Sequence, residues 1–224
     1  MTDPAPRVTV TARGPYVVEG VPLRRKRVVR TERDEPVAWE TTEQLPAAGT
    51  LSLCRCGASG NNPYCDGSHR TADWDDTETA PTTTYDERAE PYPGDGVVVR
   101  DDRGLCQHAG FCATKTTNAW RMTRHSEDTA VRSQLLAMVE HCPSGALTAR
   151  APGAAADLEP DLAVAVSAVE DGPLWLTGGV PVQRADGAPF ERRARVVLCR
   201  CGASASKPLC DGSHTRVGFR DPAR

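Results

Sequence analysis

Residues 54–69 of this 224-residue chain are nearly the same as residues 199–214. The two stretches read CRCGASGNNPYCDGSH and CRCGASASKPLCDGSH, and 12 of their 16 positions are identical. The likeness continues upstream, where GPYVVEGVPL corresponds to GPLWLTGGVPV, and downstream, where Trp74 and Phe219 each follow the histidine of their copy by five positions. An internal repeat of this kind indicates two copies of one small domain rather than a single continuous fold.

Three thiols and one imidazole recur in each copy at identical spacing. These are candidate metal ligands: Cys54, Cys56, Cys65 and His69 in the first copy, and Cys199, Cys201, Cys210 and His214 in the second. Three thiolates and one imidazole suit either zinc or an iron–sulfur cluster. Structural zinc sites usually have two to four residues between the first two cysteines, whereas only one residue separates Cys54 from Cys56.

Both copies resemble the CDGSH, or NEET-type, iron–sulfur domain. The family pattern also asks for a serine or threonine and a proline between the cysteines, and these positions hold Ser59 and Pro63, or Ser204 and Pro208. The resemblance implies one 2Fe-2S cluster in each copy, held by three cysteines and one histidine. It also implies that two such domains pair through β-strands, so the two copies are expected to form an intramolecular pseudo-dimer.

Other positions of the repeated motif also have expected roles. Gly57 and Gly202 leave room for the backbone to approach the cluster sulfides, and Asp66 or Asp211 would cap a helix that presents the histidine. One histidine in place of a cysteine removes a negative charge, which should raise the potential above the ~−400 mV of plant-type ferredoxins. Because metal-bound imidazole is deprotonated, acid should loosen the cluster.

The three remaining cysteines lie between the copies, in CQHAGFC and HCPSGAL. Cys106, Cys112 and the Cys142-Pro143 pair make this segment similar to divergent single-cluster bacterial ferredoxins, with Ala109 where another cysteine would stand. Three thiolates favour a 3Fe-4S cluster. A 4Fe-4S cluster would need one more ligand, either water, hydroxide or His108, the nearest candidate side chain.

The sequence predicts an α+β fold of small β-rich modules. Short apolar runs such as Tyr16–Val18 and Leu174–Leu176 suit strands, and 161–169 should be a strand leading into the second copy. Apolar positions of DTAVRSQLLAMVEHC recur at helical spacing, with Ser126 or Asp128 as the cap. The expected domains are a CDGSH domain at 1–75, a linker at 76–92, a ferredoxin-like α+β domain at 93–152 and a second CDGSH domain at 153–224.

Charge and hydropathy exclude some classes of function. A formal charge of −3 gives no strong field for nucleic acid, and no long apolar run or signal peptide indicates a membrane or secreted protein. We therefore expect a soluble, cytoplasmic monomer, a compartment in which nine cysteines favour metal or redox chemistry over disulfides. Arg24, Arg25, Lys26 and Arg27 form a basic run that suits a solvated strand or a dock for an acidic redox partner.

Three clusters, without a recognisable nucleotide fingerprint or catalytic constellation, predict electron transfer rather than enzyme catalysis. The expected partners are oxidoreductases. Two alternatives stay open: a carrier that donates 2Fe-2S clusters to apo iron–sulfur proteins, and a sensor of redox state or iron.

Overall fold

Strands from both repeats build a four-stranded sheet in the computed structural model, which describes residues 4–47 and 49–221. The order is β11-β1-β2-β5, where β1 (Arg7–Val10), β2 (Tyr16–Glu19) and β5 (Leu51–Leu53) belong to the first repeat and β11 (Val182–Gln183) to the second. The predicted strand over 16–18 is confirmed, since its residues alternate between buried and half-buried.

A five-stranded sheet packs beside the first, in the order β12-β10-β9-β3-β4. Its second-repeat strands are β9 (Ala165–Val169), β10 (Leu174–Thr177) and β12 (Arg195–Leu198), and all their residues are buried. The first repeat adds β3 (Leu23–Arg30) and β4 (Pro36–Leu45). The predicted strand at 161–169 is thus shorter than expected, because only its last five residues enter the ladder.

The two repeats exchange strands: the second gives β11 to the sheet of the first, and the first gives β3, with its hairpin partner β4, to the sheet of the second. β1 pairs in parallel with β11, and β3 pairs in parallel with β9. Because β3 and β11 occupy corresponding places in the repeated sequence, the exchange is reciprocal. Side chains from both repeats then share one apolar core, which includes Tyr16, Leu53, Leu174 and Leu198, each fully buried. Neither repeat could bury these side chains alone.

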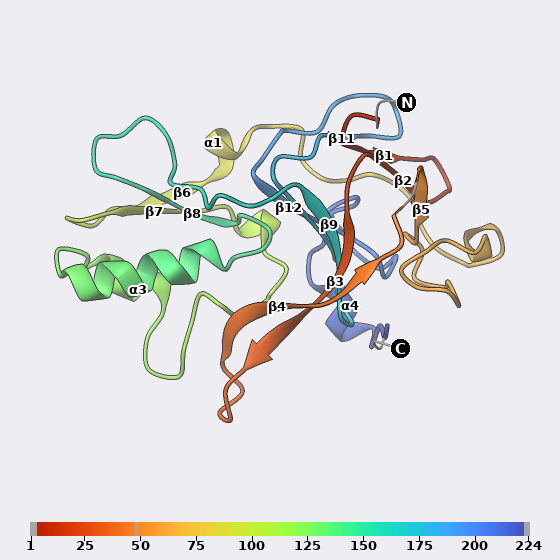
Figure 1. Cartoon of the computed structure of the whole chain (residues 1–224). Coiled ribbons are helices and arrows are strands. Elements are labelled where there is room, and N and C mark those ends of the chain that lie inside the picture. Colours follow the sequence, from red (N-terminus) through yellow and green to blue (C-terminus); the bar gives the residue numbers. More distant parts are fainter. Residues whose placement is uncertain (1–3, 48, 222–224) are drawn as a thin grey trace.

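The segment between the repeats forms a small α+β module at one side of the molecule (Figure 1). Its sheet has the order β6-β7-β8, with β6 (Glu90–Tyr92), β7 (Val98–Asp101) and β8 (Leu147–Arg150), and it packs against helices α2 (Ala119–Thr123) and α3 (Thr129–Glu140). The predicted helix is confirmed, and Asp128 rather than Ser126 caps it. The Asp128 carboxylate accepts from the N–H groups of Ala130 and Val131 at 2.8 and 3.2 Å.

The segment over 76–92, predicted from sequence as a linker, is packed into the molecule. It contains helix α1 (Tyr85–Arg88) and strand β6, and the side chains of Ala80 and Tyr85 belong to the main core. The N–H groups of Thr79 and Ala80 donate to the carbonyl of Lys207 at 2.8 and 2.9 Å. The polar composition of the segment did not indicate this packing, because only two of its apolar side chains enter the core. Among the residues described, no helix is long and apolar enough to cross a membrane.

Candidate metal centres

Backbone hydrogen bonds fold each repeated motif into a compact loop after its strand. The N–H of Cys54 donates to the carbonyl of Pro63 at 2.8 Å, and the Ser59 hydroxyl donates to the carbonyl of Tyr64 at 2.6 Å. The same two bonds recur in the second repeat, between Cys199 and Pro208 at 2.8 Å and between Ser204 and Leu209 at 2.6 Å. The serine and proline of the motif therefore shape the loop that presents the cysteines.

A short helix presents the histidine of each motif. In the first repeat this is the 3-10 helix η1 (Ser68–Arg70), and in the second it is α4 (Ser213–Arg216). The Asp66 carboxylate accepts from the N–H groups of Ser68 and Gly60 at 3.0 and 2.8 Å, and these bonds lower its pKa to about 2. The predicted capping role is therefore shifted by one residue: Gly67, with φ of 91°, holds the N-cap position, and the aspartate before it supplies the acceptor.

The four candidate ligands of each repeat lie as two pairs. The Sγ atoms of Cys54 and Cys56 are 3.9 Å apart, and Cys65 Sγ is 3.2 Å from His69 Nδ1. The corresponding distances in the second repeat are 3.8 Å between Cys199 and Cys201 and 3.3 Å between Cys210 and His214. Within the described residues, no group of three or more such side chains converges on one metal position.

This paired arrangement fits a centre with two irons, because each iron of a 2Fe-2S cluster takes two protein ligands. The first pair of thiols also shares a proton. The pKa of Cys54 is lowered to about 6, because its thiolate accepts from Cys56 and from backbone N–H groups, while the pKa of Cys56 is raised. Thiolate is the form that binds metal, and within this pair the shifts favour it at Cys54 and oppose it at Cys56.

The two motif loops meet backbone to backbone. Cys56 and Cys201 form an antiparallel bridge, and a Cβ placed on Gly57 would lie 2.4 Å from the carbonyl oxygen of Cys201. A Cβ on Gly202 would lie at the same distance from the carbonyl of Cys56. These glycines let one loop approach the other, with φ of 82° and 76°, and their expected role beside the cluster sulfides stays a prediction.

Sequence analysis missed the arginine that stands between the first two cysteines of each motif. Arg55 and Arg200 are each 1% exposed. Arg55 donates to the carbonyls of Thr11 and Asp76 at 3.0 and 2.7 Å and lies 5.2 Å from the Trp74 ring. Arg200 lies 5.1 Å from the Phe219 ring and pairs with Asp221. The signal was present, since both the arginine and the aromatic residue after the histidine recur in the repeat.

The three central cysteines surround one cavity. Cys106, Cys112 and Cys142 line a space of about 140 Å³, together with residues from the loop over 107–111 and from Pro143 onward. Burial raises the pKa of Cys112 to about 11, and the neighbouring Cys142 and Cys106 add to the shift. Three thiols gathered around one cavity suit a cluster with three cysteine ligands.

His108, the candidate fourth ligand, stands between this cavity and the second repeat. It lines the cavity, but a Cβ placed on Gly212 would lie only 2.8 Å from its ring atom Cδ2. Gly212 is the motif glycine directly before α4. The central loop therefore rests against the second motif at the turn that presents His214. Burial, and then the charge of Arg200, lower the pKa of His214.

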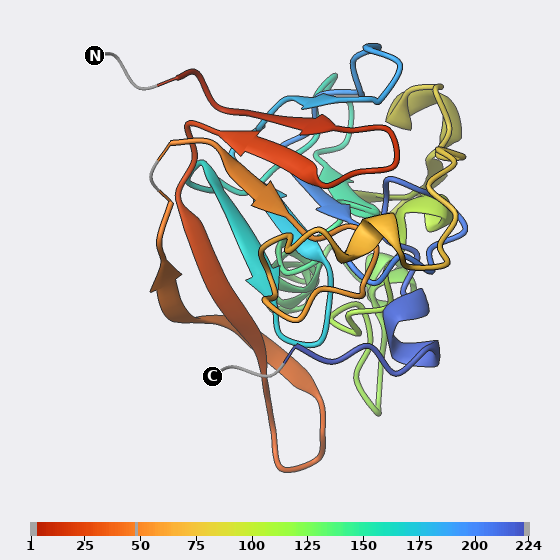
Figure 2. The ribbon, with the colours of Figure 1, turned by 90° about the vertical axis from the view of Figure 1, so that its right-hand side faces the viewer.

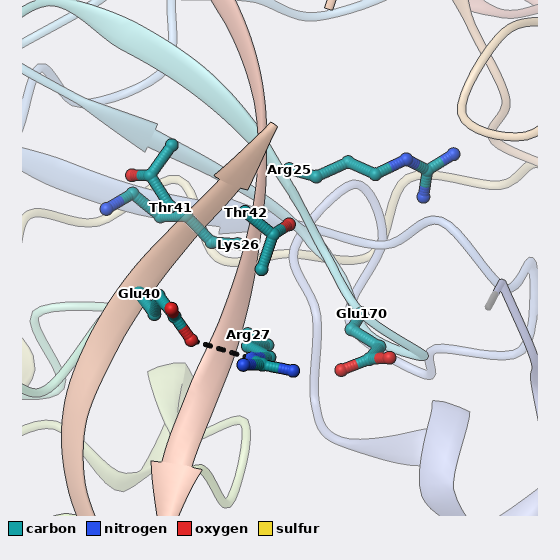
Figure 3. A pocket seen from close by; sticks show the side chains of 7 residues that line it. All are labelled: Arg25, Lys26, Arg27, Glu40, Thr41, Thr42 and Glu170. Atoms are coloured by element: carbon teal, nitrogen blue, oxygen red, sulfur yellow. Dashed lines mark hydrogen bonds and ion pairs between the residues drawn. The ribbon is translucent and has the colours of Figure 1, made fainter. Parts of the chain in front are cut away.

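The basic run at Arg24–Arg27 is largely used inside the fold. Arg25 is 6% exposed and donates to Asp221 and to the carbonyl of Asn62 at 2.8 and 2.9 Å. Figure 3 shows Arg27 directed toward Glu40, to which its Nε donates at 2.7 Å. Arg25 thus has a buried structural role, the pair of Arg27 with Glu40 is exposed, and a docking role of the run stays a prediction.

The sites define an iron–sulfur protein, and comparison with known families agrees. Residues 13–70 and 171–215 match the family described as "Iron-binding zinc finger CDGSH type", and residues 92–152 match "Divergent 4Fe-4S mono-cluster". The chain therefore carries two CDGSH-type iron-binding regions, which flank a divergent 4Fe-4S mono-cluster domain. A comparison with curated proteins gave no significant match.

Proposed function

We propose that this chain is an electron-transfer protein with two Cys3His 2Fe-2S clusters and one three-cysteine cluster, 3Fe-4S or 4Fe-4S. The observation that carries the proposal is the direct contact between the candidate sites. The Cys56–Cys201 bridge joins the two repeated sites, and the His108–Gly212 contact joins the central site to the second. Paired residues of such a bridge have Cα atoms about 4.5–5.5 Å apart.

The chain's own residues would hold the clusters and tune their charge. Cys54, Cys56, Cys65 and His69, with their counterparts in the second repeat, would bind the 2Fe-2S clusters, and Cys106, Cys112 and Cys142 the central one. Such clusters accept and release single electrons. Arg55 and Arg200, buried beside these loops, would offset negative charge on the thiolates, because opposite charges attract strongly where water is excluded.

The architecture belongs to the same proposal. The reciprocal strand exchange supports an intramolecular pseudo-dimer of the two CDGSH domains, with a ferredoxin-like domain inserted between them. Such a chain would work as a cytoplasmic monomer, exchange electrons with oxidoreductases and catalyse no reaction on a substrate. All nine cysteines are then used as ligands.

A redox titration monitored by electron paramagnetic resonance tests this function. The anaerobic protein is expected to take up electrons reversibly, with separate midpoints for the central cluster and the histidine-ligated clusters. His69→Cys and His214→Cys should each lower the potential of one cluster, because a charged thiolate replaces a neutral imidazole. Clusters that decay on reduction instead of cycling would contradict an electron carrier.

The open surroundings of the first site favour a second candidate, donation of a cluster to apo iron–sulfur proteins. Among the described residues, no atom lies within 4 Å of a Cβ placed on Gly67, whereas the corresponding Gly212 is in contact with the central loop. Incubation with an apo-ferredoxin separates the two functions. Gain of a cluster by the acceptor would support donation, and retention by this chain would support electron transfer.

A further inference from the structure

The first repeat has an insertion that the second lacks, and it forms the long β3–β4 ribbon. Only Leu23–Lys26 of β3 pair with β9, so the outer half of the ribbon extends beyond the rest of the sheet. Figure 2 shows it projecting from the body, and its residues Glu35 and Pro36 contact the central loop at Lys115 and Gly110. The repeated sites do not need such an extension, since the second repeat builds its loop without one.

Trp39 of the ribbon touches the residues directly before two of the central cysteines. Its Nε1 donates to the carbonyl of His141 at 3.0 Å, and His141 precedes Cys142. Its ring centroid lies 5.1 Å from that of Phe111, which precedes Cys112. The Phe111 and His141 rings stack on each other at 5.2 Å, so one tryptophan contacts both cysteine-bearing segments.

The tip of the ribbon contacts the same loop at two further points. The backbone N–H of Lys115 donates to Glu35 Oε1 at 2.6 Å. A Cβ placed on Gly110 would lie 3.3 Å from Pro36 Cγ, so the ribbon also rests on the loop before Cys112. The loop is held on both sides of this cysteine.

The other face of Trp39 is anchored to the second repeat. Its ring centroid is 4.9 Å from that of Trp175 on β10, and Trp175 belongs to the same apolar cluster as Cys210. The anchor is rigid, because every residue of β10 is buried. Trp39 therefore lies between a fixed strand and a loop with little regular structure of its own.

The central loop has particular need of such support. Ala109 stands where a fourth thiolate would be, and left-handed backbone at His108 (φ 62°) and Gly110 (φ 91°) leaves the loop without a helix or strand. Fewer covalent ties to a cluster leave more conformational freedom for the protein to restrict. Contacts outside the ligand set commonly supply this restriction in metal sites.

We propose that the β3–β4 ribbon, through Trp39, is the positioning element of the central site and keeps the Cys112 and Cys142 segments at the spacing that a cluster requires. The inference rests on the proposed iron–sulfur cluster at this site. It gives the insertion a role that the repeated sites do not share. Loss of Trp39 should release the central cluster and spare the other two.

The test compares Trp39→Ala and Trp39→Phe with Glu40→Gln. Glu40 is the next residue of the same strand, and its exposed pair with Arg27 is remote from the cysteines, which makes it the matched control. Cluster content is measured by iron, sulfide and the paramagnetic signal of each cluster type, followed by the rate of loss to a chelator. Trp39→Ala should speed loss of the central cluster by about tenfold or more, and Trp39→Phe, which lacks the N–H donor, by less. Glu40→Gln should match the unaltered protein.

Retention of the central cluster at the normal rate in Trp39→Ala, or equal loss of all three clusters, would overturn the inference. If Trp39→Ala fails to fold, Glu35→Ala at the exposed ribbon tip tests the same claim, and it should speed central loss by a smaller factor. Failure of the proposed function would give a different result from failure of this inference. In that case the unaltered protein itself would hold no iron–sulfur cluster at the central site.

Discussion

The first and second CDGSH regions share 12 of 16 motif positions, yet their surroundings differ. Cys65 is partly exposed, whereas the corresponding Cys210 is 2% exposed. Gly67 is open among the described residues, whereas Gly212 lies against His108 of the central loop. The corresponding positions of two nearly identical motifs therefore differ in burial: Cys210 packs with apolar residues of β9, β10 and β12, and the central loop adds a contact at Gly212. Sequence identity sets the ligands, and tertiary packing sets their exposure.

The largest expected effect of this difference is on cluster retention. His69→Ala and His214→Ala should each leave one intact repeated site, so each variant reports on a single CDGSH cluster. With a strong iron chelator, the first-site cluster of His214→Ala should be lost about tenfold faster than the second-site cluster of His69→Ala, because Cys210 is buried against the strands of its repeat and the central loop contacts Gly212. The visible absorption decay gives both rates. Equal rates of loss would mean that the packing around the second site does not protect its cluster.

The two motif glycines offer a sharper comparison at one position. Gly67→Ala and Gly212→Ala both impose a positive φ on alanine, which costs about 1–3 kcal/mol. Only Gly212→Ala adds a clash, with the His108 ring at 2.8 Å. We expect it to lower the free energy of unfolding by about 2 kcal/mol more than Gly67→Ala. Denaturant unfolding measures both, and similar losses would mean that the central loop can move aside at little cost.

Acid should separate the two sites in the same single-site variants. Burial lowers the pKa of His214, so its neutral, metal-binding form persists to lower pH. Stability supplied by that neutral imidazole is present above its pKa and is lost as pH falls through it. The second cluster should therefore bleach at a lower pH than the first. A spectroscopic acid titration checks this, and the reverse order would contradict it.

A smaller effect concerns a tyrosine of the first repeat that supports the second site. The hydroxyl of Tyr16 donates to the carbonyl of Cys199 at 2.8 Å, and the corresponding position of the second repeat is Leu174. Tyr16→Phe should cost about 1 kcal/mol, because it leaves a buried carbonyl short of a donor. Tyr64→Phe, which removes an exposed hydroxyl bonded to Pro46, is the control and should cost less. Thermal unfolding compares the stability of the two variants. A larger loss of stability in Tyr64→Phe would contradict the supporting role of Tyr16 at the second site.

Local patterns predicted the parts of the fold that depend on local chemistry. The 3.6-residue period and the aspartate before it located α3 and its cap, and short apolar runs located β2 and β10. Spacing also located the paired donors of each repeat, because a short motif loop can bring its own side chains together. These features form mainly through contacts between residues that are close together in the sequence.

Long-range pairing accounts for what the sequence could not predict. The exchange of β3 and β11 between sheets and the contact of Gly57 with Cys201 depend on how two separate segments meet. Arg55 and Arg200 are charged side chains that sequence rules place at the surface, yet in the interior each donates to backbone carbonyls and lies beside an aromatic ring, and Arg200 also pairs with Asp221. Composition also could not indicate that the segment at 76–92 packs against the core. It could not show which repeat the central module would contact.

Iron, acid-labile sulfide and zinc per chain, measured on anaerobically purified protein, test the central claim most directly. With two 2Fe-2S clusters and one central cluster, we predict a brown protein. It should hold about seven iron and eight sulfide per chain if the central cluster is 3Fe-4S, or about eight of each if it is 4Fe-4S. A colourless protein that holds zinc even after iron-replete anaerobic expression would contradict it, because the repeated sites would then be structural zinc centres.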